Sequence, residues 1–292
     1  MKIKVSFLKE KEWVNKYVRF VFHIPTFITL GVVVLVPVSV IIYLSFTSYQ
    51  LGLTGIQWIG LENYLRLPYD ERFVNAIWHS FYFVGGALFL ELLLGMGFAL
   101  LLNNNFRGRA IYRILLLLPM MSIPTAIGMA WRMMYNRSFG VLSHFVTLFG
   151  LQPIPWLSSA QLTIPALIIV DVWHWSPFVM IILLAGLHSL PTIIYEAAAI
   201  DGASKRRQFL YLTLPLMKSY IIIAVVLRGI LAFKTFDKVW VMTQGGPNFA
   251  SELLNVYLYT TAFLYFNFGY ACAVGVIFLG IMTTLVLLRI RT

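Results

Sequence analysis

The stretch EAAAIDGASKRRQFLYLTLP, residues 196–215, decides how this chain is interpreted. It opens on a run of alanines, which favours a short helix. Gly202 follows, where the backbone turns easily because glycine has no Cβ, and Pro215 stands where a new helix would have its first turn. Strongly apolar segments flank the stretch on both sides. The sequence therefore predicts a helix, a turn and a second helix in a polar loop that is attached to a membrane at both ends.

The composition indicates a membrane protein independently of that stretch. Of 292 residues 60% are hydrophobic and 11% are charged, and the mean hydropathy is +0.83, whereas soluble domains carry roughly 25% charged residues. The net charge of +11 lies mostly in short loops, which indicates membrane topology and not a nucleic-acid surface. Cys272 is the only cysteine, so no disulfide and no thiolate metal site can form within the chain.

Hydropathy predicts six membrane-spanning helices, since about 20 apolar residues cross roughly 30 Å of hydrocarbon. Their predicted ranges are 24–46, 76–102, 112–135, 161–188, 220–242 and 261–288. The first range is too long and too far from the N-terminus for a cleaved signal peptide, so we expect it to be retained. The predicted fold class is an all-α integral membrane protein, with a tail at residues 1–23 and a transmembrane domain at 24–292.

The distribution of Lys and Arg predicts the orientation of these helices. Basic residues gather in the tail, at 107–113, at 205–218 and at the C-terminal end. The opposite side holds Arg66, Arg72, Arg132 and Arg137, which nearby acidic residues partly offset. Because short cytoplasmic loops carry the excess of positive charge, we expect both termini and the loop at 196–215 to be cytoplasmic.

The stretch resembles the EAA loop of binding-protein-dependent ABC importers, which matches at Glu196, Ala197, Ala198, Gly202, Leu214 and Pro215. This resemblance implies the permease fold of type I ABC importers in a bacterial cytoplasmic (inner) membrane. It also implies a cytoplasmic coupling helix, within residues 190–219, that docks into a groove of an ATP-hydrolysing subunit. The residues expected to couple to that subunit are Glu196, Ala197, Ala198, Asp201, Gly202, Leu214 and Pro215.

Other parts of such a machine are expected on separate chains. The sequence has no Gly-x-x-x-x-Gly-Lys-Ser/Thr motif to wrap nucleotide phosphates, so ATP and Mg²⁺ are expected on a partner ATPase and the chain is not itself an enzyme. The loops at 47–75 and 136–160 are too short for a ligand-binding domain. The expected partners are a second permease subunit in a heterodimer, two ATP-binding subunits and an extracytoplasmic solute-binding protein.

A second stretch, FDKVWVMTQGGP at residues 236–247, narrows the resemblance to one branch of the importer family. Gly-Gly-Pro is expected to end a helix near the outer surface. Placed after an EAA loop, Phe-Asp with Met-Thr-x-Gly-Gly-Pro resembles the maltose-type and glycerol-phosphate-type permeases, in particular the first of their two membrane subunits. The resemblance implies a saccharide as cargo, with glycerol phosphate as the alternative, and it leaves the particular sugar open.

Two predicted helices carry polar and aromatic side chains at helical spacing. Asp171, His174, Trp175 and Phe178 recur at i, i+3, i+4 and i+7, so they are predicted to share one helix face. A second predicted face has the same spacing on the fifth helix. The resemblance implies that sugar is held by the middle of these two helices, and the candidate substrate residues are His174, Trp175, Phe178, Arg228, Leu231, Ala232 and Thr235.

Alternative interpretations remain open at this point. The aromatic residues are equally consistent with helix packing. Arg228 near the membrane midplane costs roughly 2.5–3.5 kcal/mol to insert, so it requires either Asp171 or Glu91 as a partner or an anionic cargo. Lys234 and Lys238 add positive charge nearby and strengthen this requirement slightly, while Asp237 weakens it.

Other functional classes are less consistent with the sequence. A secondary carrier would show internal repeats with broken helices, and we find none; a channel would give the EAA-like stretch no role. The histidines outside position 174 are scattered near helix ends without ligand spacing, so no metal site is expected.

Overall fold

The computed structural model describes residues 20–52 and 55–290, and every regular element in these ranges is a helix. The one β-type contact in this part of the chain is an isolated bridge between Thr47 and Trp58. The predicted all-α fold is therefore confirmed for the described residues. Most of the predicted tail, residues 1–19, and the last two residues lie outside them.

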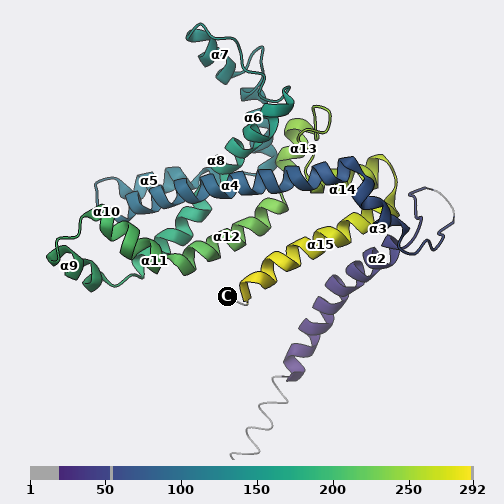
Figure 1. Ribbon diagram of the computed structural model, residues 1–292, viewed down its shortest axis with the longest axis horizontal. Helices are drawn as coiled ribbons and strands as arrows, with labels where there is room; N and C mark the ends of the chain where they lie inside the picture. The colour runs from purple at the N-terminus through teal and green to yellow at the C-terminus, as the bar shows by residue number, and fades with distance from the viewer. Residues whose placement is uncertain (1–19, 53–54, 291–292) are drawn as a thin grey trace, which may run out of the picture. The chain divides into compact units, whose positions relative to one another are not determined.

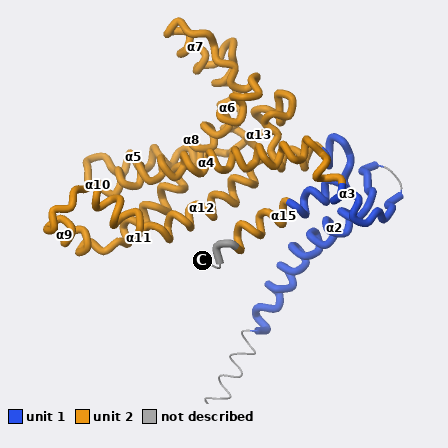
Figure 2. Tube along the Cα trace, in the orientation of Figure 1, with its two compact units in different colours: residues 1–65, 261–277 blue, residues 66–260, 278–292 orange. Residues whose placement is uncertain are grey.

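The chain divides into two compact units, which Figure 2 shows in different colours. The first comprises residues 1–65 and 261–277, and the second comprises residues 66–260 and 278–292.

The first unit is built on the apolar helix Phe20–Ser45. This helix includes a π-helical turn, η1 (Gly31–Leu35), followed by α2 (Val36–Ser45). The short α3 (Glu62–Arg66) begins in this unit. Further along the chain, another π-helical turn, η5 (Thr260–Leu264), leads to the start of α15 (Phe268–Ile290).

Backbone contacts join the end of α2 to the start of α15 within this unit. Gly269 N–H donates to the Tyr49 carbonyl at 2.8 Å, and a Cβ on Gly269 would lie 2.3 Å from the Thr47 carbonyl oxygen. The buried Asn63 side chain donates to the carbonyls of Ser45 and Thr47 at 2.8 and 3.0 Å. Position 269 therefore requires glycine, because any side chain would separate these segments.

The second unit holds the remaining elements (Figure 1). In chain order they are η2 (Leu67–Tyr69), α4 (Glu71–Asn103), α5 (Arg109–Leu117), η3 (Pro119–Met121), α6 (Pro124–Met134), α7 (Val141–Leu148), α8 (Ala160–His188), α9 (Thr192–Ile200), α10 (Lys205–Gln208), η4 (Phe209–Thr213), α11 (Leu214–Leu216), α12 (Lys218–Phe233), α13 (Asp237–Thr243) and α14 (Leu254–Tyr259).

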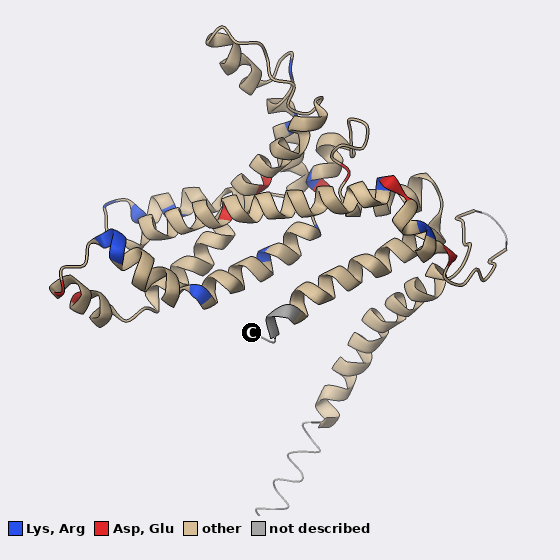
Figure 3. Ribbon diagram, viewed as in Figure 1, with Lys and Arg blue, Asp and Glu red and all other residues tan. Residues whose placement is uncertain are grey.

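The long helices α4 and α8 pack along each other and form the centre of this unit. Their contact is close, because a Cβ on Gly95 would lie 2.8 Å from Val179 Cγ1 and 3.1 Å from the Met180 backbone nitrogen. Small residues at membrane helix interfaces let two backbones approach in this way. Figure 3 shows that charged residues are sparse along these helices, whereas α10 is basic. The few charges inside the unit consequently need a specific explanation.

Within the described residues four single helices are candidate spans, and the number rises to the predicted six if each of two bent helix pairs counts as one span. Phe20–Ser45, α4, α8 and Phe268–Leu287 of α15 are each long and apolar enough to cross a membrane. Two bent pairs supply the others: Arg109–Met121 with Pro124–Met134 at 95°, and Lys205–Leu216 with Lys218–Phe233 at 62°.

The predicted helices at 112–135, 220–242 and 261–288 are each interrupted in the structure, so the prediction that they are continuous is wrong. The third predicted helix breaks around Pro119 and Pro124, because proline removes a backbone donor and disfavours helix in the residue before it. The sixth begins only at Phe268, since Phe266 adopts a left-handed φ of 57° and Asn267 accepts from the Tyr270 and Ala271 backbone N–H groups. The fifth predicted helix ends early, at Phe233, where α12 stops.

We predict that Gly95→Leu lowers the thermal unfolding midpoint of the purified protein, since overpacking of a close contact costs about 1–3 kcal/mol. Gly97→Leu is the matched control, because Gly97 is an exposed glycine on the same helix with nothing within 4 Å of an added Cβ. Equal midpoints for the two variants would contradict the close packing of α4 on α8.

Candidate functional site

A cluster of buried charged residues lies inside the second unit. Arg228 on α12 is fully buried, with its Nε 2.8 Å from Glu91 Oε2 of α4 and its Nη2 donating to Glu91 Oε1 at 2.9 Å. The same Nη2 donates to Asp171 Oδ2 of α8. Lys238 on α13 donates from Nζ to the other carboxylate oxygen of Asp171. Four helices are therefore joined by ion pairs in an apolar environment.

The charges within this cluster compensate one another. Two carboxylates face one guanidinium and one ammonium, so Arg228 has internal partners and needs no anionic cargo to offset it. The sequence alternative in which Arg228 pairs with Asp171 or Glu91 is confirmed, and it pairs with both. Lys238 also differs from the sequence interpretation, since it is buried against Asp171 and does not present free positive charge.

Three aromatic residues of α8 extend from the cluster. Lys238 Nζ lies 3.2 Å from His174 Nδ1, and a charged ammonium can only donate, so Nδ1 accepts. The Trp175 ring centre is 5.3 Å from Arg228 Cζ, within range of a cation–π interaction. Phe178 packs edge-on against Trp175 with ring centroids 5.9 Å apart. The predicted face of α8 thus exists, but its polar residues, Asp171 and His174, are already bonded to Arg228 and Lys238 of the charge cluster.

The predicted second face, on the fifth helix, is only partly present. Arg228 and Ala232 are buried, whereas Leu231 is 38% exposed and Thr235 is half-buried. Thr235 lies beyond the end of α12, so the expectation that these four residues share one helix face is wrong for Thr235.

The helix ends at Phe233 because other groups satisfy its last carbonyls and redirect the chain. Asn255 Nδ2 donates to the Phe233 carbonyl at 2.7 Å, and Thr235 N–H bonds back to the Ala232 carbonyl at 3.1 Å. The chain then restarts as α13, which carries Lys238 to Asp171. The hydropathy of this segment, from which one continuous helix over 220–242 is predicted, gives no sign of the break.

The loop at 190–219 folds as predicted, as helix, turn and helix. Helix α9 ends before Gly202, whose φ of 77° is left-handed, and the Ala203 N–H closes the turn on the Ala198 carbonyl at 2.9 Å. Ser204 then caps α10 by accepting from the Arg207 N–H. Pro215 lies near the C-terminal end of the continuous helix Lys205–Leu216, just before the bend of 62° to Lys218–Phe233, so its predicted place in the first turn of a new helix is wrong.

The surface of this loop, which contains the predicted coupling residues, is mostly exposed. Glu196, Ala197, Asp201, Gly202 and Pro215 are exposed, while Ala198 and Leu214 are half-buried. Apolar side chains are exposed on the same loop: Ile200 is 86% exposed, Tyr211 is 75% exposed and Ile193 is 71% exposed. Glu196 also lines a cavity of about 640 Å³ beside His188 and Thr192.

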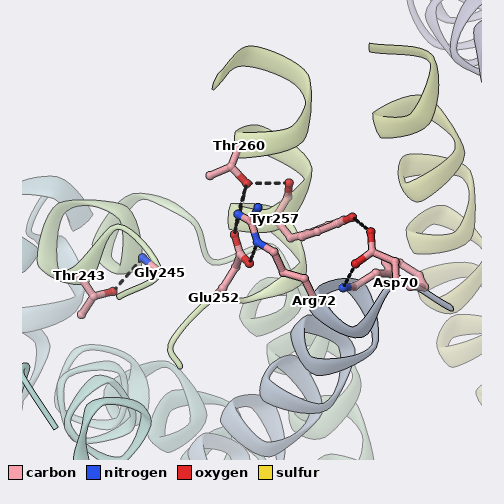
Figure 4. Close-up of polar contacts among 8 residues, drawn as sticks. Asp70, Arg72, Thr243, Gly245, Glu252, Tyr257 and Thr260 are labelled. Carbon is pink, nitrogen blue, oxygen red and sulfur yellow. Dashed lines mark hydrogen bonds and ion pairs between the residues drawn. The ribbon is translucent and has the colours of Figure 1, made fainter. Parts of the chain in front are cut away.

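A second polar network fixes the segment that follows the Gly-Gly-Pro motif (Figure 4). The Arg72 guanidinium donates two hydrogen bonds of 2.6 Å to the Glu252 carboxylate and one of 3.1 Å to Thr260. Its Cζ lies 3.9 Å from the Phe249 ring centre. Tyr257 adds a hydrogen bond of 2.6 Å to Asp70. The sequence predicts these charged residues on one side of the membrane, but a pair separated by 180 positions leaves no local signal of its pairing.

The Gly-Gly-Pro motif itself ends a helix, as predicted. Helix α13 stops at Thr243, and Gln244 and Gly245 adopt left-handed φ angles of 51° and 86°. Gly245 N–H donates to Thr243 Oγ1 at 3.3 Å, and Ser251 Oγ donates to the Gly246 carbonyl at 2.6 Å. The segment is therefore a defined turn.

These features define a multi-pass membrane protein: within the described residues it has several apolar helices long enough to cross a membrane, an internally neutralised charge cluster and a structured polar loop. A family model described as "Binding-protein-dependent transport system inner membrane component" matches residues 91–291. The chain belongs to this family.

Similar proteins agree with this assignment. A trehalose/maltose transport system permease protein of Thermococcus litoralis is 35% identical, over 84% of this chain and 82% of its own. A sulfoquinovosyl glycerol transport system permease protein of Agrobacterium fabrum is also 35% identical, over 91% and 87%. A solved bacterial alginate ABC transporter contains a chain of the same fold, with a TM-score of 0.82 and 20% identity over 95% of this chain and 94% of that one. The resemblance inferred from the sequence is confirmed, and the channel and secondary-carrier alternatives are set aside.

We predict that Arg228→Gln lowers the thermal midpoint strongly and reduces uptake of neutral and acidic saccharides equally. Removing one partner of a buried ion pair costs about 3–5 kcal/mol, because it leaves charge uncompensated. Lys234→Gln is the matched control, since Lys234 is the exposed residue that ends the same helix. Loss of acidic saccharide uptake alone, at an unchanged midpoint, would instead assign Arg228 to the cargo.

Proposed function

We propose that this chain is one of two permease subunits in an ATP-driven importer, which takes a saccharide from a solute-binding protein outside the membrane. The observation that carries this proposal is the pair of sugar-transport permeases that are 35% identical over most of the chain. One of them is named for neutral disaccharides and the other for a sulfonated glycoside. Both relatives are named for saccharides, so a saccharide is the cargo class that they have in common.

The loop at 190–219 is the proposed contact to the ATP-hydrolysing subunits, which would hold ATP and Mg²⁺. Ile193, Ile200 and Tyr211 expose apolar surface there, and exposed apolar patches on loops indicate a protein partner. Ala197 has a small side chain that permits close approach, and Glu196 is available to a basic group on the partner. The carboxylate at Asp201 lies next to the Gly202 bend and adds a second acceptor.

The proposed contact between this loop and the ATP-hydrolysing subunits implies an orientation of the chain in the membrane. The loop would lie in the cytoplasm with both termini, in agreement with the excess of Lys and Arg on that side. ATP binding would draw the loops of the two permeases together and open the cavity between them outward.

The saccharide is proposed to contact the parts of the two predicted faces that remain accessible. Trp175 and Phe178 are half-buried and offer aromatic surface to sugar C–H faces, and Leu231 and Thr235 are partly exposed on the neighbouring segment. His174, Arg228 and Ala232 are buried, so they would act by positioning these neighbours. The second permease would supply the opposite wall.

We predict that Glu196→Lys and Gly202→Leu uncouple ATP hydrolysis from transport while the membrane bundle still assembles. The first variant places a cation opposite the partner's basic group, and the second forces a left-handed backbone on leucine, which costs about 1–2 kcal/mol. Gly150→Leu is the matched control for backbone strain, because Gly150 has a φ of 73° and lies away from the loop.

The measurement is ATP hydrolysis by the complete complex in liposomes, with and without saccharide-loaded binding protein, together with copurification of the ATPase. Unchanged stimulation in both loop variants would remove the coupling assignment. Loss of activity in Gly150→Leu to the same extent would show that strain alone explains the result.

A further inference from the structure

A cavity of about 540 Å³ lies within the second unit, at the end of α8 opposite to the coupling loop. Its lining combines Arg132 in the last turn of α6, Tyr135 and Arg137 just after α6, Trp156 before α8 and Thr243 at the end of α13. Cavities of this volume suit small molecules, including one or two sugar units. The predicted substrate residues on α8 and α12 do not line it.

The cavity is positively charged without compensation. Arg132 and Arg137 both line it, and no Asp or Glu does. Neither arginine forms an ion pair within the described part of the chain, in contrast to Arg72 and Arg228. Two uncompensated guanidinium groups at one concave surface attract an anion.

The frame around the two arginines is rigid. Asn136 Oδ1 accepts from the backbone N–H groups of Ser138 and Phe139 at 2.9 and 3.3 Å, which holds the turn that presents Arg137. A Cβ on Gly140 would lie 2.3 Å from the Asn136 carbonyl, so this turn requires glycine. Arg132 is oriented by donating from Nη1 to the Val241 carbonyl at 3.0 Å, which leaves its other donors for a ligand.

An aromatic wall stands beside the two arginines. Tyr135 is buried, donates from its hydroxyl to the Ala166 carbonyl at 3.1 Å, and packs against Trp156 with ring centroids 5.3 Å apart. Because Tyr135 is buried behind it, the half-buried Trp156 is the ring that could present apolar surface to a sugar, while the guanidinium groups would face the charged substituent.

The position of this cavity relative to the coupling loop follows from α8. The helix has 29 residues and is therefore about 43 Å long, with the cavity beside its first turn and the loop after its last. If the loop is cytoplasmic, the cavity lies on the outer side, where cargo arrives.

We propose that this cavity binds the carboxylate, sulfonate or sulfate group of an acidic saccharide as the cargo enters the transporter. The inference deepens the proposed function and rests on it, since it names the substrate class as acidic. Arginine forms paired hydrogen bonds to planar carboxylates and to the oxygens of sulfur and phosphorus oxyacids. The acidic preference therefore belongs to Arg132 and Arg137, and not to Arg228, which is internally neutralised.

The test measures equilibrium binding to the complete complex in lipid nanodiscs without the binding protein, by calorimetry. The probes are trigalacturonate and glucose 6-sulfate, each compared with a neutral counterpart: the methyl ester of the first and free glucose for the second. We expect the acids to bind at least tenfold more tightly than the neutral forms, and more weakly as salt rises.

Arg132→Gln combined with Arg137→Gln is expected to abolish this preference. Arg113→Gln is the matched control, since Arg113 is an exposed arginine on α5 and does not line the cavity. Equal binding of acids and neutral forms, or an unchanged preference in the double variant, would overturn the proposal.

A separate readout distinguishes failure of this inference from failure of the importer assignment. ATP hydrolysis stimulated by a binding protein loaded with a neutral saccharide tests the importer alone. If that stimulation is present while neither acid is preferred, the chain is an importer permease and the cavity is not an acidic sugar site.

Discussion

The structure of the second unit depends on the ion pairs that Arg228 and Lys238 make with Glu91 and Asp171. In an apolar environment each of these charges is stable only beside its partners. The pairing brings α4, α8, α12 and α13 together at one point. It also accounts for the interrupted fifth span, since α12 delivers Arg228 to one side of Asp171 and the separate α13 delivers Lys238 to its other oxygen.

Helix α8 connects the two polar ends of the unit. Its close contact with α4 at Gly95 leaves little room for relative movement of these two helices, whereas the neighbouring spans are interrupted or bent. The coupling loop follows its last turn, and the arginine-lined cavity lies beside its first turn. Helix α8 is thus the continuous element that lies between the loop and the cavity.

Much of this fold was predictable, and the exceptions have physical reasons. The long single helices follow from hydropathy, and the turns at Gly202 and Gly245 follow from glycine at left-handed positions where few other residues fit. The end of α12 was not predictable, since it depends on Asn255, which lies 22 residues further along the chain. The start of α15 has a local signal that the hydropathy analysis missed, because the Asn267 side chain caps the helix by accepting from the Tyr270 backbone N–H. The Arg72–Glu252 pair and the cavity around Arg137 bring together distant residues, so no local pattern indicates them.

The order of the charged residues along the chain bears on how the protein is made. Synthesis proceeds from the N-terminus, so Glu91 and Asp171 leave the ribosome 137 and 57 residues before Arg228. Both acids are therefore synthesised before either cation. The helices α12 and α13 follow and supply the charges that neutralise them, so a nascent chain truncated before residue 228 would hold two carboxylates without these partners.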